Sequence, residues 1–194
     1  MRTRNPPVSS SSLTLVEFTG VVDRHQNALC AFLHHLVGDI EQAYDLLQDT
    51  LHDAWRAARE GVPPFVAESD DDQMRRWLFS VAYHKGLSVL RRRRLIRWES
   101  LDFLIKFIGE PGGDSPSFED QLAESEALRA ALARLAPQDR ACFLLRAAHG
   151  LSAAEVGQII GASPEVVRKR LSRARQRLRA IYLAQNTRVS EPGQ

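Results

Sequence analysis

Residues 163–180 read SPEVVRKRLSRARQRLRA, a stretch with six arginines and one lysine against a single acid, Glu165. A helix that carries this much positive charge repels itself unless a partner neutralises it. The phosphates of DNA do so, and the counterions that they release then drive binding. A solvated basic helix or an RNA-binding helix is the alternative. The chemistry that this segment predicts is therefore electrostatic binding of a polyanion, not the making or breaking of bonds.

The same segment carries an apolar stripe, which predicts how it is held. Apolar residues recur at helical spacing and would dock one side of a helix on its own domain: Val167, Leu171, Ala174, Leu178 and Ile181. Ahead of it, Ser152 and Glu155 form a capping-box pattern for a short helix that ends near Ile160. A tight turn follows at 161–162, and Ser163 would cap the basic helix. Together these elements predict a helix-turn-helix.

In a helix-turn-helix protein, the beginning of the second helix enters the major groove of DNA. That geometry points five side chains at base edges: Glu165, Val166, Arg168, Lys169 and Ser172. The arginines further along would hold phosphates, beginning with Arg173 and Arg175. The segment is thus predicted to read a DNA sequence with its first turns and to fix the register with its later ones.

The rest of the chain predicts helices, with no alternating run that would indicate a strand. Helical patterns cover about residues 15–36, 39–59, 74–96, 118–134 and 137–148. Residues 61–73 contain two prolines and an acidic run, and they predict a loop. Prolines and glycines at 109–117 indicate a linker between two groups of helices.

We therefore predict an all-α chain of two small helical domains, at residues 15–98 and 121–184. A flexible linker at 99–120 would join them, and it includes part of an acidic stretch. Residues 1–14 and 185–194 are predicted to be a disordered arm and a disordered tail.

The second predicted helix, from Asp39 to about Arg59, separates apolar residues from acidic ones. At 100° per residue its polar side chains fall on one side: Glu41, Asp45, Gln48, Asp49, His52 and Asp53. Residues 39–53 hold five acids and no lysine or arginine, whereas residues 91–97 form a second basic block. Blocks of opposite sign indicate separate surfaces with separate partners.

The composition argues against several classes of protein. Cys30 and Cys142 show neither a disulfide framework nor metal-ligand spacing, so we predict no metal and no other cofactor. No apolar run approaches the roughly 20 residues that span a bilayer, and we expect a cytoplasmic protein that is not inserted in a membrane. No zinc-binding histidine pair, nucleophile elbow, Walker loop or dinucleotide fingerprint occurs. We expect neither enzymatic activity nor a small-molecule substrate.

Three stretches together resemble a known family. LSAAEVGQIIGASPEVVRKRLSRARQRLR, at 151–179, resembles the region 4 helix-turn-helix of bacterial sigma-70 family sigma factors. AYDLLQDTLHDAW, at 43–55, resembles their region 2 helix that binds core polymerase. WLFSVAYHKGLSVLRRRRL, at 77–95, resembles the promoter-melting helix that follows it. Two regions in this order with a linker are the layout of the extracytoplasmic-function (ECF) group, and the resemblance covers about residues 15–183.

The resemblance implies a partner for each charged surface. Region 2 docks on the clamp helices of the largest subunit of core RNA polymerase, and the matching residues are Asp45, Gln48 and Asp49. The third helix would open the −10 element of promoter DNA with aromatic and cationic side chains: Arg75, Arg76, Tyr83, His84, Lys85, Arg91 and Arg92. Region 4 would read the −35 element with the residues of the basic helix named above, and it would touch the polymerase flap. An anti-sigma factor often holds members of this group inactive.

Three positions depart from the family pattern. His84 and Ser88 stand where relatives usually have Asn and Asp, which puts specific −10 readout in question. Gly157 replaces the usual Ala, at a cost of about 0.5–1 kcal/mol of helix stability, and would loosen the unit slightly. Two other functions stay open: a dimeric helix-turn-helix transcriptional regulator, and a degenerate homologue that binds polymerase without melting promoters. The region 2 half argues against the first, because a simple repressor would not need it.

Overall fold

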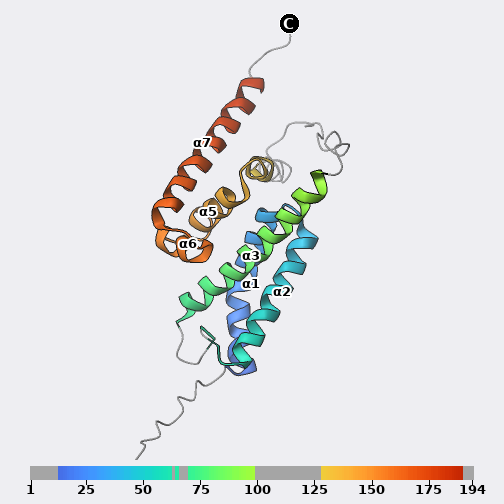
Figure 1. Ribbon diagram of the computed structural model, residues 1–194, viewed down its shortest axis with the longest axis vertical. Coiled ribbons are helices and arrows are strands. Elements are labelled where there is room, and N and C mark those ends of the chain that lie inside the picture. Colours follow the sequence, from blue (N-terminus) through green and yellow to red (C-terminus); the bar gives the residue numbers. More distant parts are fainter. Residues whose placement is uncertain (1–12, 63, 66–69, 99–127, 190–194) are drawn as a thin grey trace, which may run out of the picture.

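The structure, a computed structural model, describes residues 13–62, 64–65, 70–98 and 128–189, and its regular elements there are all helices (Figure 1). The first half consists of α1 (Leu15–Val37), α2 (Ile40–Arg59) and α3 (Asp71–Trp98). The second half consists of a helical stretch at 128–133, α5 (Pro137–Ala147), α6 (Ala153–Ile160) and α7 (Pro164–Val189). The predicted all-α fold with two groups of helices is confirmed. The predicted linker at 99–120 lies outside the described residues, as does most of the predicted arm.

The helix boundaries follow from caps that the sequence encodes. Ser152 Oγ accepts a hydrogen bond from Glu155 N–H at 3.2 Å, and Glu155 Oε2 accepts one from Ser152 N–H at 2.8 Å, so the capping box is present. Asp39 caps α2 by accepting from the amide three residues on, at 3.1 Å. Ser163 caps α7 in the same way, at 3.3 Å. Gly161 ends α6 with a φ of 67°, in the left-handed region that favours glycine.

Two helix ends differ from the predicted ones. α3 begins at Asp71, inside the acidic run that the sequence assigns to a loop. The Asp71 carboxylate accepts a hydrogen bond from Arg24 at 3.0 Å and lies 3.2 Å from a ring nitrogen of His25, both on α1. Because a helix dipole stabilises carboxylates in the first turn, the acidic run starts the helix instead of preceding it. α7 continues to Val189, beyond the predicted domain end at residue 184.

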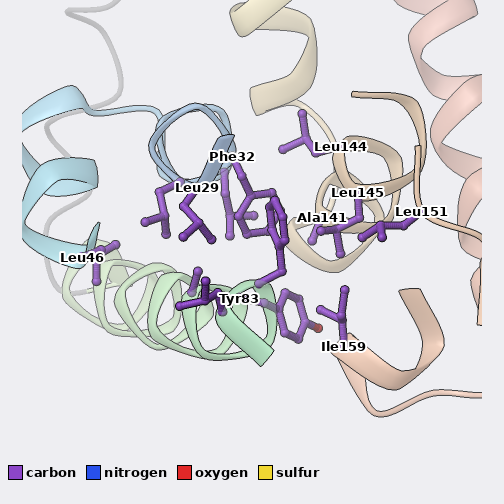
Figure 2. Packing of buried hydrophobic residues seen from close by; sticks show 14 of the residues in the cluster. Leu29, Phe32, Leu46, Tyr83, Ala141, Leu144, Leu145, Leu151 and Ile159 are labelled. Atoms are coloured by element: carbon purple, nitrogen blue, oxygen red, sulfur yellow. The ribbon is translucent and has the colours of Figure 1, made fainter. Parts of the chain in front are cut away.

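The two halves share one hydrophobic core (Figure 2). From the first half, Phe32 on α1 and Tyr83 on α3 are 0% and 3% exposed. From the second half, Leu145 on α5 and Ile159 on α6 are buried as well, and Figure 2 shows Tyr83 directed at Ile159. α3 packs against α5 and α6, and α1 packs against α5. The two groups of helices thus lie against each other, an arrangement that we call closed.

Two arginines from distant elements meet the C-terminus of α1. The last carbonyl groups of a helix have no partner within it and need donors from elsewhere. Arg93 of α3 donates to Val37 O at 3.1 Å, and Arg140 of α5 donates to Leu36 O at 2.7 Å. Positive charge at this end of a helix is also favoured by the helix dipole. The end of α1 is therefore a junction of both halves.

Gly157 lies in α6 where the chain turns back toward α7. A methyl group on Gly157 would lie 2.5 Å from the carbonyl oxygen of Ala162, too close for either atom to stay in place. The turn also brings Ala162 N–H within 2.9 Å of the Gly157 carbonyl oxygen. Glycine here allows a tight turn, so the packing does not support the sequence-based expectation of a looser unit.

Replacing Gly157 with Ala is expected to lower the free energy of unfolding by about 1–2 kcal/mol. Overpacking costs roughly 1–3 kcal/mol, and the gain in helix propensity of about 0.5–1 kcal/mol offsets only part of it. Urea denaturation followed by circular dichroism measures the change. Gln158→Ala, at the neighbouring exposed position, is the control. A Gly157→Ala protein as stable as the unmodified chain would show that the turn relaxes freely.

Candidate nucleic-acid interface

α7 presents an exposed basic face to solvent. All seven side chains predicted to contact the −35 element are exposed: Glu165, Val166, Arg168, Lys169, Ser172, Arg173 and Arg175. Arg168, Ser172 and Arg175 follow one another at helical spacing and line a groove of about 480 Å³, together with Leu171, Gln176 and Arg179. This face can receive a polyanion without any rearrangement of α7.

Several cations of α7 already have partners within the chain. Arg170 and Arg173 each lie 3.2 Å from Asp139 Oδ1, in the first turn of α5, and Lys169 lies 3.1 Å from Glu165. The Arg170 side chain is 22% exposed, whereas that of Arg173 is 62% exposed. Arg170 therefore fastens α7 to α5, and Arg173 combines this contact with an exposed surface.

The C-terminal part of α3 keeps three of the predicted −10 residues exposed: His84, Arg91 and Arg92. His84 Nδ1 lies 2.7 Å from the carbonyl oxygen of Ser80, and Ser88 Oγ donates to the carbonyl oxygen of His84 at 2.9 Å. Both side chains that depart from the family pattern thus bond to the backbone of their own helix. The two arginines remain available for phosphates.

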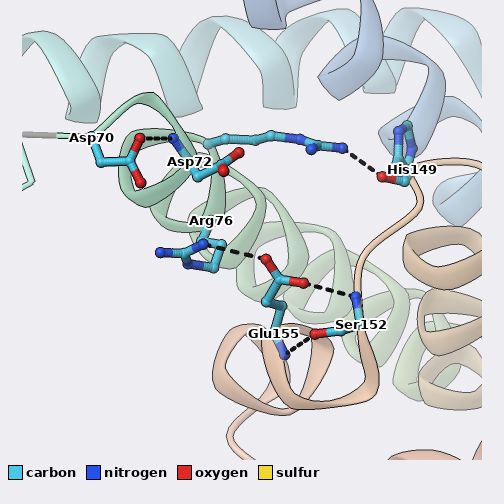
Figure 3. A network of polar contacts seen from close by, with 7 residues as sticks. Asp70, Asp72, Arg76, His149, Ser152 and Glu155 are labelled. Atoms are coloured by element: carbon cyan, nitrogen blue, oxygen red, sulfur yellow. Dashed lines mark hydrogen bonds and ion pairs between the residues drawn. The ribbon is translucent and has the colours of Figure 1, made fainter.

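The N-terminal part of α3 is covered by the second half (Figure 3). Arg75 donates to the carbonyl oxygen of His149, and Arg76 lies 3.3 Å from Glu155 Oε1. Tyr83 is buried in the shared core, and this burial raises its pKa. The closed arrangement therefore occupies two predicted −10 cations and removes the predicted aromatic platform from solvent.

Lys85, another predicted −10 residue, joins two helices of the first half. Its Nζ lies 2.8 Å from Asp53 Oδ2 on α2. The hydrogen bond from Lys85 lowers the pKa of the Asp53 carboxyl. Electrostatic interactions with Lys85, Arg56 and His52 lower this pKa further. In this arrangement Lys85 holds α3 on α2, and binding a phosphate would require it to leave that carboxylate.

The acidic side of α2 is open to solvent. Asp45, Gln48 and Asp49, the predicted polymerase-binding residues, are all exposed. Within the part of the chain that the structure describes, neither aspartate takes part in an ion pair. Tyr44 is also 53% exposed beside them, so the surface offers an aromatic side chain as well as negative charge. The closed arrangement leaves this surface accessible.

The junction between the halves contains residues that the sequence analysis misses. Arg140 is 7% exposed, and His149 lies half-buried against the first half. The cap formed by Glu155 is visible in the sequence, but its ion pair with Arg76, on a distant helix, is not. The sequence contains one signal of the burial of Arg140. It lies on the same side of its helix as Ala141, Leu144 and Leu145, which are apolar and buried.

Three features of the described residues bear on metal binding, on membrane insertion and on the reactivity of a thiol. No group of three or more His, Cys, Asp or Glu in them could hold a metal ion. No helix among the described residues is long and apolar enough to cross a membrane. Cys142 is buried, and this burial raises the pKa of its thiol to about 11, so the thiol stays protonated and unreactive.

Comparisons with known proteins agree with the resemblance. The family described as Sigma-70, region 4 matches residues 125–178. The ECF RNA polymerase sigma factor SigG of Mycobacterium tuberculosis is 28% identical over 91% of this chain and 51% of SigG. SigE of Mycolicibacterium smegmatis is 30% identical over 86% of this chain and 62% of SigE. Among solved structures, the sigma factor RpoE of Bartonella quintana, in complex with the anti-sigma factor NepR, has a TM-score of 0.66 at 26% identity, covering 87% of this chain and 98% of RpoE.

The fold and the basic helix define a protein of the helix-turn-helix class, an arrangement that many DNA-binding proteins use. The comparisons agree in one respect: the chain is similar to sigma-70 family RNA polymerase sigma factors of the ECF group over most of its length, and its second half matches their region 4. The chain spans about half the length of SigG, since the match covers 51% of that protein.

Proposed function

We propose that this chain is a sigma factor that binds core RNA polymerase and directs it to promoters, leaving catalysis to the polymerase. The observation that carries the proposal is the presence on one chain of an exposed acidic face on α2 and an exposed arginine-lined groove on α7. A regulator that only binds an operator needs the groove but not the acidic face. Such a factor acts in the cytoplasm, where polymerase and chromosome are.

Each surface has one role in this proposal. Asp45, Gln48 and Asp49 bind the basic clamp helices of the largest polymerase subunit, where complementary charge speeds and orients docking. The first turns of α7 read the −35 element, with Arg168 at base edges and Arg175 on phosphates, and the second half touches the polymerase flap. No cofactor takes part.

Promoter melting by α3 requires the halves to separate. Arg91 and Arg92 are exposed and can grip the DNA backbone in the closed arrangement. Arg75, Arg76 and Tyr83 become available only when α5 and α6 leave α3. Opening is therefore a step that precedes the trapping of unstacked −10 bases, which needs an aromatic platform.

An anti-sigma factor is a further partner in this proposal. The likeness to RpoE extends over 87% of this chain, which includes residues of both halves, and RpoE was crystallised with the anti-sigma factor NepR. A protein that binds the closed arrangement better than the open one would hold Arg75, Arg76 and Tyr83 covered.

Removing two phosphate contacts from α7 is expected to weaken the salt dependence of DNA binding. For Arg175→Ala with Arg179→Ala, two exposed arginines that line the groove, the slope of log Kobs against log salt on a duplex should become less steep by about 1.8, since each phosphate contact contributes about 0.9. Fluorescence anisotropy over a range of salt concentrations measures the slope. Arg59→Ala, an exposed arginine of α2, is the control and should leave it unchanged. An unaltered slope in the double variant would reject these arginines as DNA contacts.

Transcription from a genomic library with reconstituted polymerase tests the proposed function directly. A sigma factor produces defined start sites that core polymerase alone does not. Comigration with core polymerase in size-exclusion chromatography, without defined start sites in transcription, would identify the degenerate homologue. Absence of comigration would overturn the proposal.

A further inference from the structure

His149 is inserted between the two halves at their junction. It lies in the loop between α5 and α6, and its ring centroid is 4.7 Å from that of Phe79 on α3 and 6.1 Å from that of Phe32 on α1. Its backbone carbonyl accepts the hydrogen bond from Arg75. The side chain and the backbone of one residue therefore both connect the second half to the first.

The charged and titratable groups that act on His149 are cationic or become so. Arg75 on α3 and His35 on α1 face it. Burial lowers the pKa of His35, and its neighbour His34 and Arg129 of the helical stretch at 128–133 lower it further. His35 Nδ1 is also buried without a hydrogen-bond partner in the described structure. A proton on either histidine places like charges together.

Glu155, the acidic residue of α6 that pairs with α3 across this junction, already has hydrogen-bond partners. Glu155 accepts hydrogen bonds from Ser152 N–H and from Arg76. Hydrogen bonds from Ser152 lower the pKa of Glu155, and Arg76 lowers it further. Glu155 is therefore ionised and paired. The groups that shift the pKa of His149 are Arg75 and His35, not Glu155. A charge on His149 would be poorly balanced.

Burial lowers the pKa of His149 to about 4, and the positive charges of Arg75 and His35 add to the effect. Above its ordinary pKa of 6.5, the imidazole is neutral whether the halves are together or apart. As the pH falls below 6.5, the open form takes up a proton that the closed form refuses until about pH 4. The closed arrangement therefore loses stability as the pH falls between these two values.

We propose that His149 is an acid-sensitive latch: its neutral ring holds the second half on α3, and its protonation releases that half and uncovers Arg75, Arg76 and Tyr83. The proposal rests on the proposed function, since uncovering those residues matters only if α3 binds promoter DNA. A contact with two states that a buried histidine biases is the physical basis of pH switches. By linkage, the open-to-closed ratio rises up to about 30-fold between pH 7.5 and pH 5.

Small-angle X-ray scattering of the full chain from pH 7.5 to pH 5 tests the latch, with far-UV circular dichroism to confirm that helices persist. The unmodified chain should expand as the pH falls. His149→Phe keeps a ring between Phe32 and Phe79 but cannot titrate, so it should stay compact. His52→Gln, which removes an exposed histidine of α2, should behave like the unmodified chain.

Two outcomes would overturn the latch: a radius of gyration in the unmodified chain that does not change with pH, or a His149→Phe protein that expands equally. The first needs no variant to fold. Binding to core polymerase at pH 7.5, measured separately, keeps the two proposals apart. Acid expansion without polymerase binding would support the latch and reject the proposed function. Polymerase binding without acid expansion would support the proposed function and reject the latch.

Discussion

Replacing Asp45 and Asp49 with Lys is expected to abolish binding to core RNA polymerase, with an affinity at least about 100-fold lower. That loss corresponds to about 2.7 kcal/mol, and like charges placed across an interface cost several kcal/mol. Both side chains are exposed, so the substitutions remove no contact of the core. Lys also has a higher helix propensity than Asp, so α2 should persist. Titration of labelled protein with core polymerase at physiological salt measures the affinity.

The control for this experiment reverses two other exposed acids, Asp23 on α1 and Glu60 at the end of α2. It changes the net charge by the same amount away from the proposed surface. Because long-range attraction depends on net charge and docking depends on the local surface, the two double variants separate these effects. Equal losses in both would assign the effect to overall charge, and retained affinity in the Asp45 and Asp49 variant would reject the surface.

Local features of the fold follow from the sequence because their causes are local. The cap of Ser152 and Glu155 and the cap of Ser163 join residues three apart, and the structure contains both. The acidic face of α2 follows from helical periodicity alone. The start of α3 is missed because an acidic run next to prolines reads as a loop, while its actual stability comes from α1, through Arg24 and His25.

The closed arrangement does not follow from the sequence, for a physical reason. Arginine can donate to a phosphate oxygen or to a backbone carbonyl, so residue type alone does not tell which it will meet. Arg75 and Arg76 fit the pattern of DNA contacts, and in the structure they bind the second half. Their partners lie more than 70 residues away in the chain, beyond the reach of any local pattern.

Tyr83 illustrates the same limit for an aromatic residue. An aromatic side chain beside cations predicts a stacking platform. The ring is 3% exposed because α5 and α6 cover it in the shared core. Whether such a ring is core or platform depends on the position of the other half, which the sequence of α3 does not contain.

Replacing Arg140 with Met is expected to lower the free energy of unfolding by about 2–4 kcal/mol. The buried guanidinium donates to Leu36 O at 2.7 Å, to Ala133 O at 2.8 Å and, more weakly, to Leu135 O at 3.4 Å. It thereby joins α1, the end of the helical stretch at 128–133 and α5. Hydrogen bonds from a charged group contribute about 1.5–3 kcal/mol each, and the buried carbonyls would be left without this donor.

Two effects of opposite sign compete in this substitution. Burial lowers the pKa of Arg140, which records the cost of keeping its charge out of water, and Met would remove that cost. The charge, however, sits at the C-terminus of α1, where the helix dipole offsets part of its desolvation. Met restores the volume but supplies no donor to the carbonyls. We therefore expect the loss of hydrogen bonds to outweigh the relief of desolvation.

Arg146→Met is the matched control for Arg140→Met, because it changes an exposed arginine of the same helix that donates once, to Leu151 O at 3.0 Å. It should cost less than about 1 kcal/mol. Arg140→Lys keeps the charge but cannot reach carbonyls in different directions, so its stability should be intermediate. Urea denaturation ranks the three variants. If Arg140→Met were as stable as the unmodified chain, the cost of desolvating the guanidinium would match or exceed the stabilisation from its hydrogen bonds, and Arg140 would not hold the closed arrangement together.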